Sequence, residues 1–588
     1  MIECNLPLEC TGSETAVFRR LTRCLSNSYE DASMRLFAPI VVLLSLCAAP
    51  LQAAPPSSAD IARYARQLLV DSYPSNGPGA AVIVAHGNKV LFRAARGESD
   101  LVPAKALSAG DLFEIGSITK QFTAAGVLKL VEAGKISLDD PLSKYVKDYP
   151  NGDNVTLREL LNHTAGLKDY TELPGFMDSP LQSDVTTAQL IDTFKNEKPE
   201  FAPGTDWRYD SSGYVLLGAV IESVTGMPWH AYLKQALFQP LGMTNTGYGD
   251  DPAFVARRVH GYVLSDGKIV PSKTISLSQP SAAGALVSNV DDLLKWTRAL
   301  HGGRVLDHTL YQEMITPSGK AIAGHYGFGI DHDTLRGTDM LQHGGSIFGT
   351  NSFGLYLPRD KLTVIVLNNQ EGEIPRSNDA ETLARRIAAY AIGKPYPDRK
   401  AIAVDPATLK AYEGVYRTDD KTTRVVRVVN GVLTSQRTGS PRYVLIPIAK
   451  DDFLFDGVLS RLAFDRNAVG AVVSMHFFLN DEGEGQVATR TDAPLPPDRV
   501  AVTLPRAALE RVVGNYKSKD MGLHVFITGD KLQAQLEGQP AADLFAASPD
   551  SFFMTVVDAT LDFAPAHGVP ETVTLHQGND TIRFDRTP

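Results

Sequence analysis

A serine and a lysine three residues apart, Ser117 and Lys120, open an apolar segment whose pattern predicts a helix over 117–133. Side chains at this spacing share one helix face, so the amine can reach the hydroxyl. A serine near a helix N-terminus also meets free backbone N–H groups, which stabilise developing negative charge. The lysine can act as a base only where its surroundings lower its pKa; otherwise it orients the proton path. The pair indicates a nucleophilic serine.

The spacing by itself is common, since chance gives about two Ser-x-x-Lys patterns in a chain of this length. A second one, Ser265-Asp-Gly-Lys268, is present on an Asp-Gly turn with no helix after it. Nothing there fixes the two side chains together. Of the two serines, only Ser117 has the structural context that the chemistry needs.

Two further segments carry polar side chains at places where a cleft could form. Tyr209 lies in a predicted loop between the Pro203-Gly204 turn and a helix that begins near Gly213, so its phenol could project into a cleft. His343 is followed by two glycines that lead into a strand, and glycines there allow a ligand to approach the strand edge closely. Taken singly, such residues are more often packing or surface positions.

Together the three segments resemble the serine β-lactamase and penicillin-binding-protein superfamily, most of all its branch of class C β-lactamases, carboxylesterases and D-aminopeptidases. The resemblance covers about residues 60–392, and the stretches Leu160–Leu167 and Ala283–Leu293 support it. It implies an α+β fold in which an antiparallel sheet is flanked by helices and joined by a helical region. The motifs that carry it, with about 90 and 130 residues between them, are Ser117-x-x-Lys120, Tyr209-x-Ser211 and His343-Gly-Gly345.

The resemblance also implies roles for these residues. Ser117 would attack a carbonyl and form an acyl-enzyme, while Lys120 and Tyr209 share the proton transfers; which of the two is the base stays open. The backbone N–H groups of Ser117 and Ser346 would form an oxyanion hole, and His343 to Gly345 would line the strand side of the cleft. No metal or cofactor is expected, because the histidines offer no His-Glu-x-x-His spacing.

Two positions depart from the family pattern. Ser211 stands where the family usually has an asparagine, and a hydroxyl is shorter and cannot offer the donors of an amide. His343 stands where β-lactamases carry a lysine, and histidine is mostly neutral near pH 7. Both changes weaken the case for penicillin as the natural substrate, and the His-x-Gly form instead resembles D-aminopeptidases and some esterases.

The elements that must position these residues fit one large catalytic domain over 58–395. A helix follows Ala59, and residues 80–94 read as a hairpin around Gly87-Asn88. A helix-rich middle, further strands and a closing helix follow, which is an α+β order. The further predicted elements are helices 213–225 and 381–391 and strands 352–357 and 362–368.

Beyond this domain the chain contains a repeat. Eight identities in twenty positions relate the segment after Pro397 to the segment after Pro497, at an offset of 100 residues. We therefore predict two small all-β domains over 405–492 and 505–588, each after a proline-rich linker and each resembling a lipocalin-like barrel. Such tandem domains resemble the layout of D-aminopeptidases. Whether they reach the cleft stays open. Aromatic residues at strand-like positions are expected to form barrel core: Tyr416, Tyr516, Phe552 and Phe553.

The composition and the first residues of the chain limit the possible partners and the cellular location. The 588 residues carry 57 Lys and Arg against 67 Asp and Glu, without a basic patch, which argues against nucleic acid as a partner. All four cysteines fall within the first 47 residues. Residues 1–53 read as a leader that contains a signal peptide over Met34–Ala53, so translation could begin at Met34. The apolar stretch is too short for a stable membrane span, which predicts a periplasmic or secreted protein.

The sequence thus predicts an exported serine hydrolase that cleaves an amide or ester of a small molecule or short peptide. A D-amino-acid peptidase acting on wall-derived peptides is the leading hypothesis. The alternatives are a carboxylesterase, a β-lactamase or D,D-carboxypeptidase, and, from a different class, an inactive protein that only binds wall peptides. The choice of substrate and the oligomeric state stay open, because specificity rests on loop shape.

Overall fold

A computed structural model describes residues 55–173, 176, 181–265, 268–372, 379–419, 422–499, 501–519, 521–537, 539, 541–565, 568–577 and 580–587. The predicted leader over 1–53 with its signal peptide and cysteines, and the turn at Asp266-Gly267, lie outside these residues. Within the described part of the chain, no helix combines the length and the apolar character that crossing a membrane requires.

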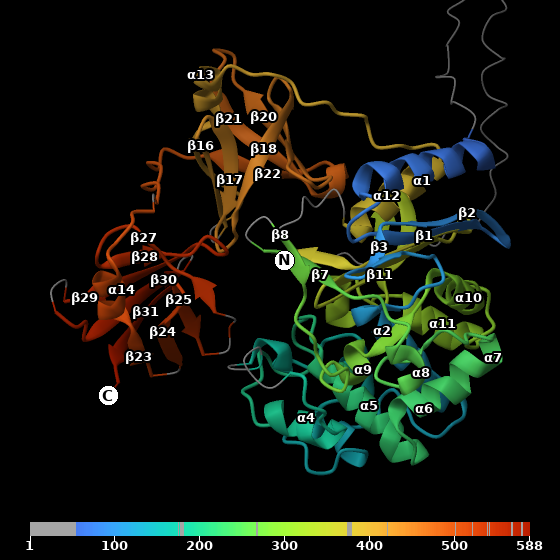
Figure 1. Cartoon of the computed structure of the whole chain (residues 1–588). Coiled ribbons are helices and arrows are strands. Elements are labelled where there is room, and N and C mark those ends of the chain that lie inside the picture. The colour runs from blue at the N-terminus through green and yellow to red at the C-terminus, as the bar shows by residue number, and fades with distance from the viewer. Residues whose placement is uncertain are drawn as a thin grey trace, which may run out of the picture. The chain divides into compact units, whose positions relative to one another are not determined.

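The catalytic domain is built on a six-stranded antiparallel sheet (Figure 1). Strand β1, near the start of the chain, pairs along its whole length with β13, in the register Ala80↔Asn368 to His86↔Leu362. The predicted hairpin and the predicted strand 362–368 are therefore neighbours at the centre of the sheet. In sheet order the strands are β10 (Asp331–Leu335), β11 (Thr338–Ile347), β12 (Thr350–Leu357), β13 (Leu362–Asn368), β1 (Ala80–His86) and β2 (Lys89–Arg96).

Both faces of the central strands are covered, which explains why β1 and β13 are almost continuously apolar. Helices α1 (Ser58–Ser72) and α12 (Ala380–Ala391) lie side by side over one face (Figure 1). The other face packs against α2 (Thr119–Glu132) and α10 (Val290–His301). The α+β fold predicted from the sequence is thus confirmed.

Helix α2 lies inside the helical region of this domain. Ten of its 14 residues are buried, so it is enclosed on every side rather than resting on a surface. Its neighbours include α5 (Ser212–Thr225) and the short α9 (Ser281–Gly284), with α3 (Leu157–Leu161) and α4 (Thr187–Phe194) packed against α5. This enclosure fixes the helix that carries the predicted lysine and follows directly on the turn with the predicted serine.

The first repeat forms a closed eight-stranded antiparallel barrel. The second forms a nine-stranded antiparallel sheet whose two end strands, β26 and β27, follow each other in the chain across Leu544. The first barrel comprises β15 (Gly414–Arg417), β16 (Thr423–Val429), β17 (Val432–Arg437), β18 (Arg442–Ala449), β19 (Asp452–Phe455), β20 (Arg461–Arg466), β21 (Val472–Phe478) and β22 (Gln486–Arg490). The second comprises β23 (Gly514–Lys517), β24 (Gly522–Thr528), β25 (Lys531–Leu536), β26 (Ala542–Asp543), β27 (Phe545–Ala546), β28 (Ser551–Phe553), β29 (Ala559–Ala564), β30 (Thr572–Gln577) and β31 (Asp580–Arg586).

A shared contact shows that the two barrels are copies of one design. The Tyr416 hydroxyl donates to the carbonyl of Tyr412 at 2.7 Å, and the Tyr516 hydroxyl donates to the carbonyl of Val512 at 2.9 Å. Tyr416, Tyr516 and Phe552 are buried in the barrel cores as predicted, whereas Phe553 is buried but lies outside the core cluster, on the opposite side of its strand from Phe552.

Candidate active site

Ser117 and Lys120 meet at the start of α2. The sequence predicted one helix from Ser117, but the structure places Ser117 in a 3-10 turn (Gly116–Ile118) that leads into α2, a common form of helix N-terminus. Lys120 Nζ donates to Ser117 Oγ at 3.0 Å and to the carbonyl of Ala283 at 3.2 Å. The lysine is completely buried, while the serine is partly exposed.

The segment around Ala283 is joined to α2 by two further hydrogen bonds. Thr123 Oγ1 donates to the carbonyl of Ala282 at 2.7 Å, and the backbone N–H of Leu286 donates to Thr119 Oγ1 at 3.1 Å. Three polar side chains on the first two turns of the helix therefore bind one short stretch of backbone. This arrangement fixes the amine of Lys120 relative to the hydroxyl of Ser117.

Burial lowers the pKa of Lys120 to about 8, although the nearby carboxylates of Asp169 and Asp210 act in the opposite direction. Its Nζ lies 4.8 Å from the centre of the Tyr209 ring and 5.7 Å from that of Tyr214. With a pKa near 8, about one lysine in ten is neutral at pH 7, whereas an exposed lysine is almost always charged. The amine can thus accept a proton from a neighbouring hydroxyl.

Tyr209 lies in the loop before α5, as the sequence predicted. Burial raises the pKa of the Tyr209 hydroxyl well above its ordinary value, and the nearby hydroxyl of Ser117 only partly offsets the effect. The phenol therefore keeps its proton at neutral pH. It can donate that proton far more readily than it can remove one.

The end of strand β11 approaches the 3-10 turn more closely than side chains would permit. A Cβ on Gly116, whose φ is +49°, would lie 2.8 Å from the backbone nitrogen of Ser346. A Cβ on Gly345 would lie 2.0 Å from the carbonyl oxygen of Ile115. Glycine is required at both positions. Because it has no side chain, the backbone of Ser346 can lie against the turn that contains Ser117.

His343 is buried beside Tyr209, with 6.2 Å between the ring centres. Its Nδ1 lies 2.5 Å from the carbonyl oxygen of Gly344, which can only accept, so Nδ1 carries the proton and Nε2 accepts from the hydroxyl of Tyr326 at 2.9 Å. Burial lowers the pKa of His343 to about 3. The ring is therefore neutral, and both of its nitrogens are engaged within the protein.

Ser211 precedes α5 and is held by its backbone rather than by its hydroxyl. Its N–H donates to Asp169 Oδ2 at 3.0 Å, while Asp169 Oδ1 accepts from the backbone and the side chain of Thr171. The hydroxyl of Ser346 donates to Glu371 Oε1 at 2.7 Å. The seven sequence-predicted positions therefore lie on three segments. Ser117 and Lys120 are on the 3-10 turn and α2, Tyr209 and Ser211 are in the loop before α5, and His343, Gly345 and Ser346 are on β11.

Several residues around this site were missed by the sequence analysis. Asp169 and Asp210 supply negative charge near Lys120, and Tyr326 caps His343. The carboxylate of Asp210 lies 3.3 Å from Nδ1 of the buried His163. Of these residues, only Asp210 could have been recognised from the sequence, because it lies between Tyr209 and Ser211 in the Tyr-x-Ser motif. Tyr326 belongs to no motif. No group of three or more His, Cys, Asp or Glu side chains in the described residues is arranged to hold a metal ion.

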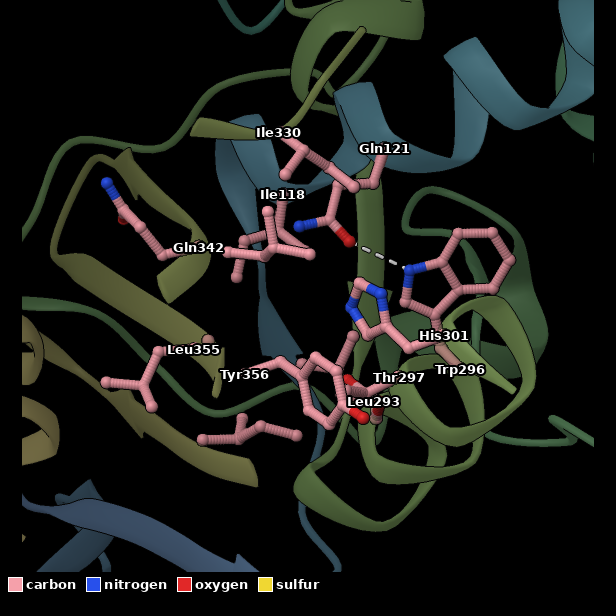
Figure 2. Close-up of a pocket in the computed structure, with 13 residues that line it drawn as sticks. Ile118, Gln121, Leu293, Trp296, Thr297, His301, Ile330, Gln342, Leu355 and Tyr356 are labelled. Carbon is pink, nitrogen blue, oxygen red and sulfur yellow. Dashed lines mark hydrogen bonds between the residues drawn. The ribbon is translucent and has the colours of Figure 1, made fainter. Parts of the chain in front are cut away.

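A small cavity of about 30 Å³ lies against the same helix, away from Ser117 and Lys120 (Figure 2). Gln121, on the next position of α2, accepts a hydrogen bond from the indole of Trp296 at 2.8 Å. His301 stacks on Tyr356, with ring centres 4.3 Å apart. A volume of this size holds about one water molecule, so the region fastens α2 to the sheet rather than admitting a substrate.

Replacing Gly345 tests the close approach of β11. In Gly345→Ala the new Cβ must push β11 away from the carbonyl of Ile115, and we expect the rate of covalent labelling by a fluorophosphonate, a reagent for activated serines, to fall about 100-fold. Gly344→Ala is the matched control, because its Cβ would lie an ordinary 3.5 Å from the Phe353 side chain. Intact-mass spectrometry over time gives both rates. Equal labelling of the two variants would contradict the steric argument.

Comparison with known proteins agrees with this geometry. A family model described as Beta-lactamase matches residues 67–389. Penicillin-binding protein 4* of Bacillus subtilis is 26% identical over 449 residues, which cover 72% of this chain and 97% of that protein. The D-aminopeptidase of Brucella anthropi is 27% identical over 334 residues, which cover 56% of this chain and 62% of that protein.

Two solved structures share the fold. The D-amino acid amidase of Ochrobactrum anthropi superposes with a TM-score of 0.51 at 24% identity, over 56% of this chain and 98% of that chain. The penicillin-binding protein homologue of Pyrococcus abyssi gives a TM-score of 0.50 at 20% identity, over 89% of this chain and 98% of that chain. With the family model matching more than half of its length, the chain belongs to the β-lactamase family of serine hydrolases.

Proposed function

We propose that this protein is an exported hydrolase that cleaves an amide or ester bond through an acyl-serine at Ser117, and that it acts as a D-amino-acid peptidase. The observation that carries the proposal is the 3.0 Å contact between Ser117 Oγ and the buried amine of Lys120. The similarity to a D-aminopeptidase supports the choice of substrate. The predicted signal peptide supports export.

In the proposed acylation step, neutral Lys120 takes the proton of Ser117 as Oγ attacks the carbonyl carbon of the substrate. The geometry favours Lys120 over Tyr209 as the base, because burial lowers the pKa of the amine and raises that of the phenol. The carbonyl oxygen becomes negatively charged in this step. The backbone N–H groups of Ser117 and Ser346, brought together by Gly116 and Gly345, would stabilise it.

The leaving amine or alcohol must then receive a proton as its bond to the carbonyl carbon breaks. Tyr209 is the donor in this proposal, since its hydroxyl keeps its proton near Ser117 and its ring lies beside the charged Lys120, which returns the proton. A water molecule attacks the acyl-serine in the second half of the reaction. The same groups act in reverse, and the acid and free Ser117 are released.

His343 bears on the choice among amide, ester and β-lactam substrates. A lysine at this position would supply a cation for a substrate carboxylate, but His343 is neutral and both of its nitrogens are already bonded. Penicillins and the substrates of D,D-carboxypeptidases both carry such a carboxylate. The site therefore favours amides and esters that lack it, with a carboxylesterase as the second candidate function.

Intact-mass spectrometry tests whether Ser117 is the nucleophile. We expect a fluorophosphonate to add one label to the parent protein and none to Ser117→Ala, because the acyl bond forms on Oγ. Ser265→Ala, which alters the other Ser-x-x-Lys pattern, is the control and should be labelled fully. Label on the Ser117→Ala variant would rule out this serine.

Hydrolysis rates then separate peptidase from esterase. We expect D-alanyl p-nitroanilide to be cleaved faster than its L-isomer by at least about tenfold, and a penicillin to leave no lasting mass increment. Faster turnover of short acyl esters, with no preference for the D-isomer, would favour the carboxylesterase.

The pH dependence tests Lys120 as the base. Because only the neutral amine accepts a proton, the rate of fluorophosphonate labelling should rise about tenfold per pH unit below about 8 and level off above it. Lys120→Arg should lose this rising limb together with most of the rate, since a guanidinium stays charged. A fluorophosphonate carries no group that titrates in this range. A flat profile between about pH 6 and 9 would contradict the assignment.

The leaving group tests Tyr209 as the proton donor. Tyr209→Phe should slow anilide cleavage by about 10²- to 10⁴-fold, because a poor leaving amine needs the proton. A p-nitrophenyl ester, whose leaving group departs as an anion, should lose much less. Equal losses for the two substrates, measured as kcat/KM, would show that the phenol acts in another way.

A further inference from the structure

Two arginines face each other at one end of the first barrel. Arg424 on β16 lies directly across from Arg437 on β17 in the strand register. Like charges at opposite positions of an antiparallel pair destabilise a sheet. Such an arrangement is therefore a cost to the barrel unless a negatively charged group offsets it.

Arg424 reaches across the barrel interior to aromatic rings on other strands. The centre of its guanidinium group lies 4.7 Å from the ring centre of Phe477 and 5.5 Å from that of Phe455. These two rings are perpendicular, 5.7 Å apart, and Tyr443 packs against Phe455. One guanidinium nitrogen donates to the buried hydroxyl of Ser435 at 3.2 Å. We refer to Arg424, Ser435, Arg437, Tyr443, Phe455 and Phe477 as the Arg424 cluster.

No carboxylate pairs with Arg424 among the described residues of the chain. Burial and the charge of Arg437 lower the pKa of Arg424 to about 10, so the group is still charged at neutral pH. Other arginines of the same barrel have acidic partners: Arg427 contacts Asp498, Arg461 contacts Asp452, and Arg466 contacts Asp451. A partly buried charge without a counter-ion is costly. Arg490, which also has no acidic partner among the described residues, donates instead to three backbone carbonyls, whereas Arg424 donates to a single hydroxyl.

The second barrel provides an internal comparison. Tyr416 pairs with Arg424 in the first barrel, and its counterpart Tyr516 pairs with Leu523 in the second. Following the register from these pairs gives an apolar residue at every position of the Arg424 cluster. In the order Arg424, Ser435, Arg437, Tyr443, Phe455 and Phe477, the counterparts are Leu523, Ala534, Leu536, Ala542, Met554 and Leu575.

These counterparts fill the end of the second barrel with ordinary core, all but Ala542 being buried. The same type of barrel thus forms without charges at these positions. The barrel topology by itself does not require the arginines, so a role in binding can account for them.

We propose that the Arg424 cluster binds an organic carboxylate with a small apolar or aromatic body. A carboxylate matches the forked donors of a guanidinium and would neutralise the facing arginines. The rings of Phe455, Phe477 and Tyr443 would contact the body of the ligand. Below the cluster the barrel is closed by its own core, including Val426 and Phe453, so a long acyl chain has no room.

Fluorine NMR on the full chain tests the proposal, with Ser117→Ala as the parent so that no probe is hydrolysed. The first probe is 4-(trifluoromethyl)phenylacetate, compared with its neutral amide. The second is an N-acetyl dipeptide ending in 4-(trifluoromethyl)phenylalanine, as the free acid and as the C-terminal amide. We expect an acid to bind at least about tenfold more tightly than its amide, because only the acid pairs with the arginines.

Arg424→Leu, which introduces the residue found in the second barrel, should weaken binding of the acid at least about tenfold. Arg417→Leu is the matched control: Arg417 lies on the adjacent strand β15 and is exposed, and this variant should bind like the parent. Arg424→Gln repeats the test with a polar side chain should the leucine variant fold poorly, as judged by circular dichroism.

Binding of the phenylacetate alone would identify small organic acids as the ligand class, and binding of the dipeptide acid alone would identify peptide C-termini; either result supports the proposal. Equal affinity for acid and amide would overturn it. So would unchanged binding in Arg424→Leu and Arg424→Gln, or the absence of saturable binding by both acids.

Discussion

The burial of the Lys120 amine is the constraint on which the catalytic domain depends. A charged amine without contact with water is costly, so the surrounding protein must supply acceptors and negative charge. The hydroxyl of Ser117 and the carbonyl of Ala283 accept hydrogen bonds from the amine, and Asp169 and Asp210 supply the negative charge. The same burial lowers the pKa of the amine, so the feature that is hardest to stabilise is also the one on which the proposed reactivity of Ser117 depends.

Close approach of backbone to backbone is the second requirement of this site. The 3-10 turn and the end of β11 come from parts of the chain more than 200 residues apart, and they meet where Gly116 and Gly345 carry no side chains. Hydrogen-bond donors of the main chain are fixed by the fold and need no reorganisation during a reaction. The enclosed helix α2 and the central strands hold both segments in place.

The two barrels show how one backbone can serve different purposes. Register and the buried tyrosine contact are the same in both copies, because these features determine whether the barrel closes. At one end, the first barrel has the partly buried Arg424, the exposed Arg437 and aromatic rings where the second has aliphatic core. The two copies therefore share one backbone and differ in the polarity of this end.

The sequence by itself determined the fold class, the hairpin β1–β2, the duplicated barrels and the helical spacing of Ser117 and Lys120. The hairpin and this spacing rest on short-range patterns that local physics enforces, whereas the barrels follow from the repeat at an offset of 100 residues, and Tyr209 was singled out through the resemblance to the family. The tertiary structure alone decided the protonation states and partners. Tyr326, which donates a hydrogen bond to His343, and Asp169, which fixes the backbone of Ser211, act across segments distant in the chain. Burial and long-range charge depend on the packing of the whole domain, and no local pattern records them.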